Sequence, residues 1–241
     1  MNTLPARSRA LLGAGLLFLG ASAAAGESLQ GALEASVNRL DLTLVGTVIL
    51  EVGNEAGYRV TADEAEALEA LRIETRGRRL IVEQETPKRL GWIWDKDERL
   101  PVTLIVTLPT FETVAFAGAG RLTGRGLSGD ELSLRLAGAG ECELGELSLG
   151  RFGLTLAGAA RCDVSGRADA LEVSIAGAGS FEGFDLETQA AQVSVAGAGS
   201  AEVTARESFK GSVAGIGHIA YRGNPGSVEQ SVSGLGRIEA D

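Results

Sequence analysis

A four-residue phrase of small residues recurs seven times in the second half of this 241-residue chain, once every 18 to 20 residues. It reads AGAG, AGAA, AGIG or SGLG. The glycine at its second position is Gly118, Gly138, Gly158, Gly177, Gly197, Gly215 and Gly234 in turn. A fixed period of this length indicates one small structural unit that is stacked repeatedly. This repeat constrains the fold more strongly than any other feature of the sequence.

Apolar and polar residues alternate with a period of two on both sides of each phrase. In the fourth copy, apolar Val173 and Ile175 flank polar Ser174, and the alternation resumes with Phe181 and Glu182. Such alternation is typical of a half-buried strand. One unit therefore consists of a strand, a glycine-rich corner and a second strand.

A single unit cannot bury its apolar side, but equivalent strands stacked in parallel bury a continuous core. Glycine suits the corner because it accepts a positive φ, whereas Ala160 indicates that the last position of the phrase does not require glycine. The sequence predicts an all-β, single-domain parallel β-helix (solenoid) with about 19 residues per coil over 37–241, with repeats clearest in 114–241. The alternative is an antiparallel barrel or sandwich with turns every 8–12 residues.

The region before the repeats carries further strand patterns in 37–60 and 72–114. Between them, residues Thr61 to Glu64 resemble a capping box, with apolar residues following at helical spacing. We expect a short helix near residues 62–70, which would cover the exposed strand edges at this end of the solenoid.

The N-terminus resembles a secretory signal peptide. Arg7 and Arg9 precede a short apolar run, and small residues follow it up to Gly26. We expect a signal peptide over 1–25 that is cleaved after Ala25, followed by a flexible mature N-terminus over 26–36. The apolar run is short for a membrane span, although a signal anchor is the alternative. The predicted location is the periplasm, the outer-envelope surface or the secreted fraction.

Charge limits the partners. The formal net charge is −10, and phosphate backbones are bound by basic faces, so nucleic acid is not expected as a partner. No membrane span is expected in the mature chain, and a homo-oligomer is compatible with the repeat.

One outward column of the repeat is acidic. Its members are Glu143, Asp163, Glu182 and Glu202. On a solenoid these carboxylates would form a ladder with a spacing of about 4.8 Å. Like charges that face each other on neighbouring strands are destabilising, so the ladder is either a solvated face eased by Arg161 or a site for Ca²⁺ or a basic partner. The nine-residue calcium repeat of β-helices is absent, and no metal or cofactor is predicted.

Cys142 and Cys162 occupy the same inward column in successive coils. Stacking would bring their Cα atoms to about 4.8 Å, within the range of a disulfide, and an oxidising compartment favours the bond. Parallel side chains could strain it, and two free thiols could pack as small core residues instead.

No catalytic set emerges from the remaining polar residues. His218 is the only histidine, and no G-x-S-x-G motif is present. Trp92 and Trp94 lie in a segment that interrupts the strand pattern. They either stack on a sugar ring or a partner or pack that loop onto the solenoid.

The chain resembles the head GIN domain family of putative auto-transporter adhesins over roughly residues 35–240. The resemblance is carried by Leu104 to Pro109, which lead into the first corner, by the corners at 20-residue spacing, and by the segment from Gly215 to Pro225 with its Y-x-G-x-P pattern. The family usually has serine and an acidic residue around that corner. In this chain alanine replaces most of the serines, and His218, Arg121 or Glu141 stands where Asp is common. The resemblance implies a β-helical envelope protein and brings no catalytic residues.

These features favour an exported, non-enzymatic envelope protein that presents flat β-helix faces to a protein or polysaccharide. A carbohydrate-active β-helix enzyme is one alternative, but it would need carboxylates that converge in one groove, and the acidic ladder repeats without converging. A purely structural envelope element is the other alternative.

Overall fold

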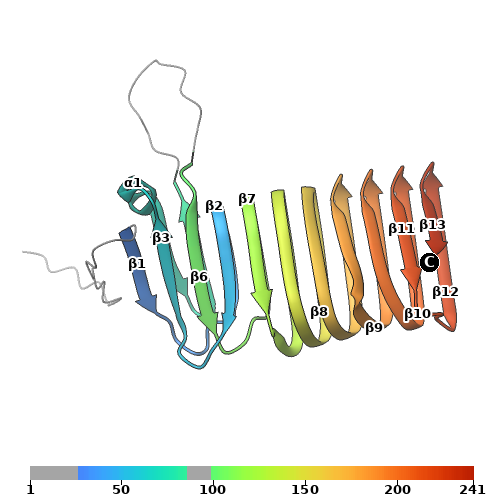
Figure 1. Ribbon diagram of the computed structural model, residues 1–241, viewed down its shortest axis with the longest axis horizontal. Helices are drawn as coiled ribbons and strands as arrows, with labels where there is room; N and C mark the ends of the chain where they lie inside the picture. The colour runs from blue at the N-terminus through green and yellow to red at the C-terminus, as the bar shows by residue number, and fades with distance from the viewer. Residues whose placement is uncertain (1–26, 86–98) are drawn as a thin grey trace, which may run out of the picture.

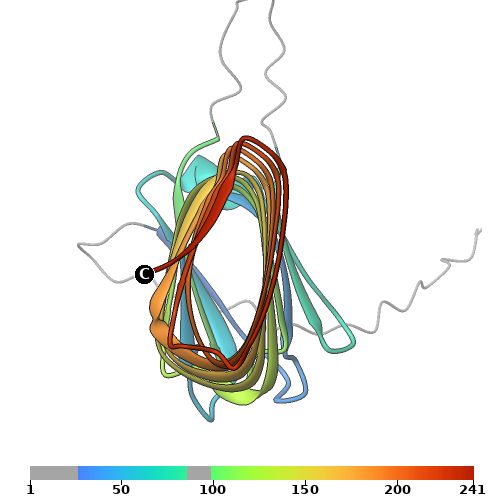
Figure 2. The ribbon, with the colours of Figure 1, turned by 90° about the vertical axis from the view of Figure 1, so that its right-hand side faces the viewer.

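The computed structural model describes residues 27–85 and 99–241 as an all-β solenoid of about six turns with coils of about 20 residues (Figure 1). Viewed along its axis, each coil is a flattened oval with two long sides joined by tight corners (Figure 2). The predicted parallel β-helix is confirmed, and the alternative of an antiparallel barrel or sandwich is wrong. No helix among the described residues is long and apolar enough to cross a membrane.

The parallel stack combines one strand from the N-terminal part of the chain with all the strands that follow residue 112. Its strands are β2 (Arg39–Val52), β7 (Thr113–Arg125), β8 (Ser128–Gly177), β9 (Ser180–Gly197), β10 (Ser200–Gly215), β11 (His218–Arg222), β12 (Ser227–Gly234) and β13 (Arg237–Ala240). Equivalent residues of successive coils pair directly, as Val173 does with Val193, and Val193 with Gly211. Sequence positions that share a column therefore share a place in space.

The N-terminal end mixes parallel and antiparallel pairing. It contains β1 (Glu27–Ala32), β3 (Gly57–Ala62), α1 (Ala65–Glu69), β4 (Leu71–Arg76), β5 (Arg79–Gln84) and β6 (Val102–Leu108). Strands β5 and β6 both pair in parallel with β2. Strand β3 pairs antiparallel with β6, β1 with β3, and β4 with β5. The regular coil therefore gives way to hairpin-like pairing at this end.

Two expectations for the N-terminal end need correction. Residues 27–32 of the supposedly flexible segment form β1, because their backbone pairs with β3 and Leu29 packs against the core. The helix exists but is shorter than predicted, and its N-cap is Glu64, with no side-chain capping bond. The capping-box interpretation is wrong, because Thr61 belongs to β3 and its backbone pairs with Ser28 of β1.

The core is a stack of apolar columns. The three largest fully buried side chains are Phe152, Phe181 and Phe209. Burial of a Leu or Phe side chain contributes about 1.5–3 kcal/mol before the loss of chain entropy is counted. Because the inward residues are mostly aliphatic, each coil fills its interior while staying narrow.

The seven corner glycines all have a positive φ, between +119° and +126° at the four nearest the C-terminus. A Cβ at Gly197 would also lie 2.5 Å from the carbonyl oxygen of Gly177 in the preceding coil. The corner therefore excludes a side chain twice, by its backbone conformation and by the close approach of the coil below. Ala160 has no positive φ, which explains why alanine is tolerated there.

We predict that Gly197→Ala lowers the free energy of unfolding by about 2–4 kcal/mol, because alanine would have to adopt a glycine-only φ and displace the backbone of the preceding coil. Thermal unfolding followed by circular dichroism would measure the change. Gly153→Ala is the matched control, since its Cβ would meet only the carbonyl of Leu132 at 4.0 Å. An equal loss in both variants, or none in Gly197→Ala, would contradict the corner's role.

Candidate binding surface

The four carboxylates of the acidic ladder lie on the coil side that follows the glycine corner. Asp163 pairs with Glu182, and Glu182 with Glu202, in direct register. Glu143 pairs with Thr123 of the coil before it. The side chain of Glu143 is 63 % exposed and that of Glu182 is 33 % exposed, so the ladder faces solvent.

Basic side chains of the neighbouring column compensate the ladder. A guanidinium nitrogen of Arg161 lies 2.5 Å from Glu182 Oε2. Arg121 forms an ion pair with Glu141 and lies 3.9 Å from Glu143 Oε2. Exposed pairs of this kind contribute at most about 1 kcal/mol each. Their effect here is to relieve repulsion between like charges along the face.

The ladder does not gather into a metal cage. Over residues 27–85 and 99–241, no three His, Cys, Asp or Glu side chains are grouped so that they could hold a metal ion. Strand pairing sets the carboxylates in a row, whereas Ca²⁺ needs six to eight oxygens around one point. The geometry supports a solvated acidic face.

The opposite long side of the coil carries a row of hydroxyls. Ser174, Ser194, Ser212 and Ser231 pair in register through four successive coils, and all are exposed. Alanine residues flank the row toward the corner, as at Ala196 and Ala214. The row itself is flat, because its side chains are short and repeat at the spacing of the strands. The next outward column of the same face bears longer side chains, with Lys210 paired to Glu229 at 3.2 Å.

Cys142 and Cys162 are buried free thiols in this structure. Burial raises the pKa of the Cys162 thiol well above its usual range, and a hydrogen bond with Cys142 adds to this effect. The two sulfurs are therefore neighbours inside the core, as the column predicted. Whether they are bonded in an oxidising compartment stays a prediction.

His218 is the first residue of β11 and directly follows a glycine corner. Its Nε2 is 3.3 Å from Glu239 Oε1 in the last coil. Its Nδ1 has no hydrogen-bond partner among the described atoms. Trp92 and Trp94 lie outside the described residues.

The Tyr221–Pro225 segment, whose role the sequence pattern did not reveal, closes one coil of the solenoid. The Tyr221 ring stacks on Phe209 with centroids 4.2 Å apart. Gly223 and Asn224 have positive φ values of 111° and 55°, which turn the chain toward β12. The Y-x-G-x-P pattern is therefore a structural turn with an aromatic anchor.

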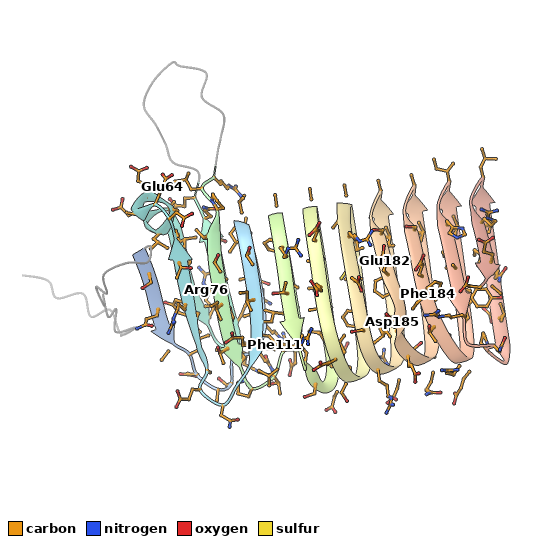
Figure 3. The ribbon with its side chains drawn as sticks, in the orientation of Figure 1. Glu64, Arg76, Phe111, Glu182, Phe184 and Asp185 are labelled. Atoms are coloured by element: carbon orange, nitrogen blue, oxygen red, sulfur yellow. The ribbon has the colours of Figure 1, made fainter. Side chains whose placement is uncertain are left out.

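Arg222, within that segment, lies over the Phe184 ring, with its guanidinium carbon 4.2 Å from the ring centroid. It also donates to Thr204 Oγ1 at 3.4 Å and lies 3.8 Å from Asp185. Phe184 and Asp185 follow Glu182 on the same coil (Figure 3). The irregular pairing between Val203 and Ser208 makes room for this cluster. Regular repeat spacing could not have indicated it.

Comparison with known proteins places the chain in a recognised group. The family described as putative auto-transporter adhesin, head GIN domain, matches residues 38–225. A solved putative adhesin from Bacteroides fragilis is 20 % identical with a TM-score of 0.77, covering 89 % of this chain and 97 % of that one. No curated protein matches the sequence.

Two further solved structures share the fold. A putative lipid binding protein from Parabacteroides distasonis is 17 % identical with a TM-score of 0.63, covering 90 % of this chain and 97 % of that one. A putative adhesin from Parabacteroides merdae is 16 % identical with a TM-score of 0.61, covering 89 % and 95 %. At these identities the likeness concerns the fold alone.

We predict that adding Ca²⁺ leaves the melting temperature unchanged to within about 1 °C, because ion pairs already compensate the ladder and a bound ion would stabilise the fold. Differential scanning fluorimetry with and without millimolar Ca²⁺ measures this. A rise in melting temperature that is lost when Glu143, Asp163, Glu182 and Glu202 are changed to their amides would establish a metal site instead.

For the cysteines, we expect protein isolated from an oxidising compartment to show no free thiol after unfolding without reductant, because the two sulfurs are neighbours. A thiol-reactive chromophore would count the thiols. Cys142→Ser should expose one reactive thiol in the same assay. Two thiols in the unfolded wild type would show that the pair stays reduced.

Proposed function

Because the chain belongs to the head GIN domain family of putative auto-transporter adhesins, we propose that it is an exported, non-enzymatic envelope protein that binds a protein or surface polysaccharide through the flat faces of its solenoid. The observation that carries this proposal is the arrangement of outward side chains in straight, in-register rows on both long sides of the coil. Such rows offer repeated, evenly spaced contacts to an extended partner.

The two faces carry different polar side chains, so substitutions can alter one face without altering the other. One face presents a row of hydroxyls beside a column that includes the Lys210–Glu229 ion pair, and the other presents a row of carboxylates paired with arginines. A polysaccharide offers many hydroxyls along one direction, so weak contacts repeated over several coils would add up through avidity. Neither face gathers ionisable groups into a groove of the kind that glycoside hydrolysis uses. These features favour binding of a polymer over its hydrolysis.

The export step rests on the N-terminal sequence. Basic residues, a short apolar run and small residues before Gly26 form the pattern of a secretory signal peptide. Adhesion requires the protein to leave the cytoplasm, so the signal and the family agree. We place the mature chain in the periplasm, on the outer-envelope surface or in the secreted fraction.

The test is a pull-down with tagged protein that starts at Gly26, incubated with a panel of purified surface polysaccharides and with envelope extracts. We expect specific retention of one polymer or protein. The double variant Ser194→Arg with Ser212→Arg places bulky charge on the hydroxyl face. The matched double variant Glu143→Gln with Glu202→Gln alters only the acidic face. One of the two should weaken retention about tenfold or more while the other leaves it unchanged, because the faces point in opposite directions.

Each other outcome would contradict the proposal. If no polymer or protein is retained, a structural role is the better account. If both double variants bind as the wild type does while keeping its circular dichroism spectrum, the long faces are not the binding surface. If polysaccharide chains are shortened during incubation, the protein is an enzyme.

A further inference from the structure

The strict register of the coils is interrupted between β9 and β10. The two strands pair in register as far as Val203 opposite Gly183. Pairing resumes with Thr204 opposite Glu187, so residues 184–186 have no partner in β10 and form a bulge in β9. Bulges commonly redirect side chains next to functional sites. This one is the place to look for a site that the repeat itself does not provide.

Two side chains of the bulge reach the surface. Leu186 is fully buried and joins the core, whereas Phe184 is partly exposed and Asp185 is exposed. Figure 3 shows Phe184 and Asp185 on the same side of the solenoid as Glu182 of the acidic ladder. The bulge therefore adds an aromatic ring and a carboxylate to a surface that otherwise repeats one pattern.

Buried hydroxyls hold the bulge in place. The Thr204 side chain, in a residue that is 5 % exposed, donates to the carbonyl oxygen of Phe184 at 2.7 Å. Thr188, which is fully buried, donates to the carbonyl oxygen of Thr204 at 2.6 Å. A buried hydroxyl without a partner is costly, so these two bonds fix the local backbone. The bulge is a defined part of the fold.

Arg222 of β11 extends back over the bulge. It pairs in register with Thr204, and its guanidinium lies over the Phe184 ring at 4.2 Å from the centroid. Its Nε donates to Thr204 Oγ1 at 3.4 Å. Among the described residues its only ion-pair partner is Asp185, whose Oδ1 lies 3.8 Å from Nη2, too far for a hydrogen bond. The guanidinium is thus held in position while its terminal nitrogens keep their capacity to donate.

These residues enclose a hollow of about 330 Å³, within the range of about 300–1,000 Å³ for small-ligand pockets. It contains a second guanidinium, that of Arg206, which lies 3.3 Å from Glu187 Oε1. Both of these side chains are about half exposed. We call this site the Arg222 hollow, and its lining consists of Phe184, Asp185, Glu187, Thr204, Arg206, Arg222 and Gly223.

We propose that the Arg222 hollow binds one carboxylate-bearing sugar unit, a hexuronate, of an acidic polysaccharide. The sugar carboxylate binds between the guanidinium groups of Arg222 and Arg206, since guanidinium and carboxylate match in shape and charge. Asp185 and Glu187 accept hydrogen bonds from the sugar hydroxyls. The inference rests on the proposed function for its polysaccharide class, and it adds a discrete site beside the long faces.

The balance of charge in the hollow selects this class of ligand. Two arginines face two carboxylates, so a phosphate ester with about −1.5 to −2 charges would be repelled more strongly by Asp185 and Glu187. A neutral sugar would leave the terminal nitrogens of Arg222 without an anionic acceptor. A hexuronate brings a single negative charge together with several hydroxyls. Because the chain has a net charge of −10, binding depends on these short contacts, and one short oligomer should bind with a Kd of about 1 mM.

The test uses the protein from Gly26 onward and trigalacturonic acid as the probe. Its fully methyl-esterified form is the matched neutral ligand, and glucose 6-phosphate tests the phosphate alternative. Amide chemical shifts in NMR spectra report both the affinity and the place of binding. Arg222→Met and Arg206→Met remove one guanidinium each from the hollow. Arg125→Met is the matched control, because Arg125 is an exposed arginine on another coil that pairs with Glu146.

We expect saturable shifts for residues around the hollow with trigalacturonic acid, and at least about tenfold weaker binding of the methyl ester. Arg222→Met and Arg206→Met should each raise the Kd about tenfold or more, whereas Arg125→Met should leave it unchanged. Arg206 is 52 % exposed at its side chain, so its variant should fold as the wild type does even if Arg222→Met alters the bulge. Circular dichroism and thermal melting check the fold of all three variants.

Four results would overturn the proposal: no saturable binding of trigalacturonic acid up to about 10 mM, equal binding of its methyl ester, tighter binding of glucose 6-phosphate, or an equal loss in Arg125→Met and the two hollow variants. The residues exchanged in the pull-down, at 143, 194, 202 and 212, do not line the hollow. Retention of a polymer through a long face can therefore fail while the hollow binds the uronate, and the reverse can also occur.

Discussion

The close approach of one backbone corner to the next is the constraint on which the rest of this solenoid depends. At Gly215 a Cβ would lie 2.5 Å from the carbonyl oxygen of Gly197, and Gly197 stands in the same relation to Gly177. Because each corner sits directly on its predecessor, the residues before and after it fall into register. That register stacks the apolar columns of the core and aligns the outward rows. Glycine at the corner thus determines the packing inside and the pattern outside.

Strict repetition has an electrostatic consequence. Any charged residue that recurs in an outward column faces its own kind in the next coil, as Glu182 faces Glu202. The neighbouring column contains both basic and acidic side chains, which reduces this repulsion. In it Arg121 pairs with Glu141, and Arg161 forms an ion pair with Glu182 of the ladder. The opposite face has a column of serine instead, and in the next column Lys210 pairs with Glu229. The two faces therefore differ in their side-chain chemistry although they share one strand spacing.

The sequence predicted those parts of the fold that repeat and missed those that do not. Period and alternation were sufficient for the coil, the direction of each side chain and the cysteine column. The corner at Gly46, with a φ of +135°, was missed because its neighbours read Leu-Val-Gly-Thr instead of the small-residue phrase. Strand β1 was missed because its partner β3 is distant in sequence, and local polarity suggested a flexible segment. The cluster around Arg222 depends on a register shift between coils, which a column alignment does not contain.

A solenoid differs from a globular domain in that its two ends are built from the same interior as its middle. At the N-terminal end the chain changes from parallel to antiparallel pairing, and Ala67 and Leu68 of α1 are buried there. At the C-terminal end the described residues continue the parallel pattern to β13 without such a change, and the apolar columns reach solvent at Val232. The two ends therefore present different strand edges, although the coils between them repeat one pattern.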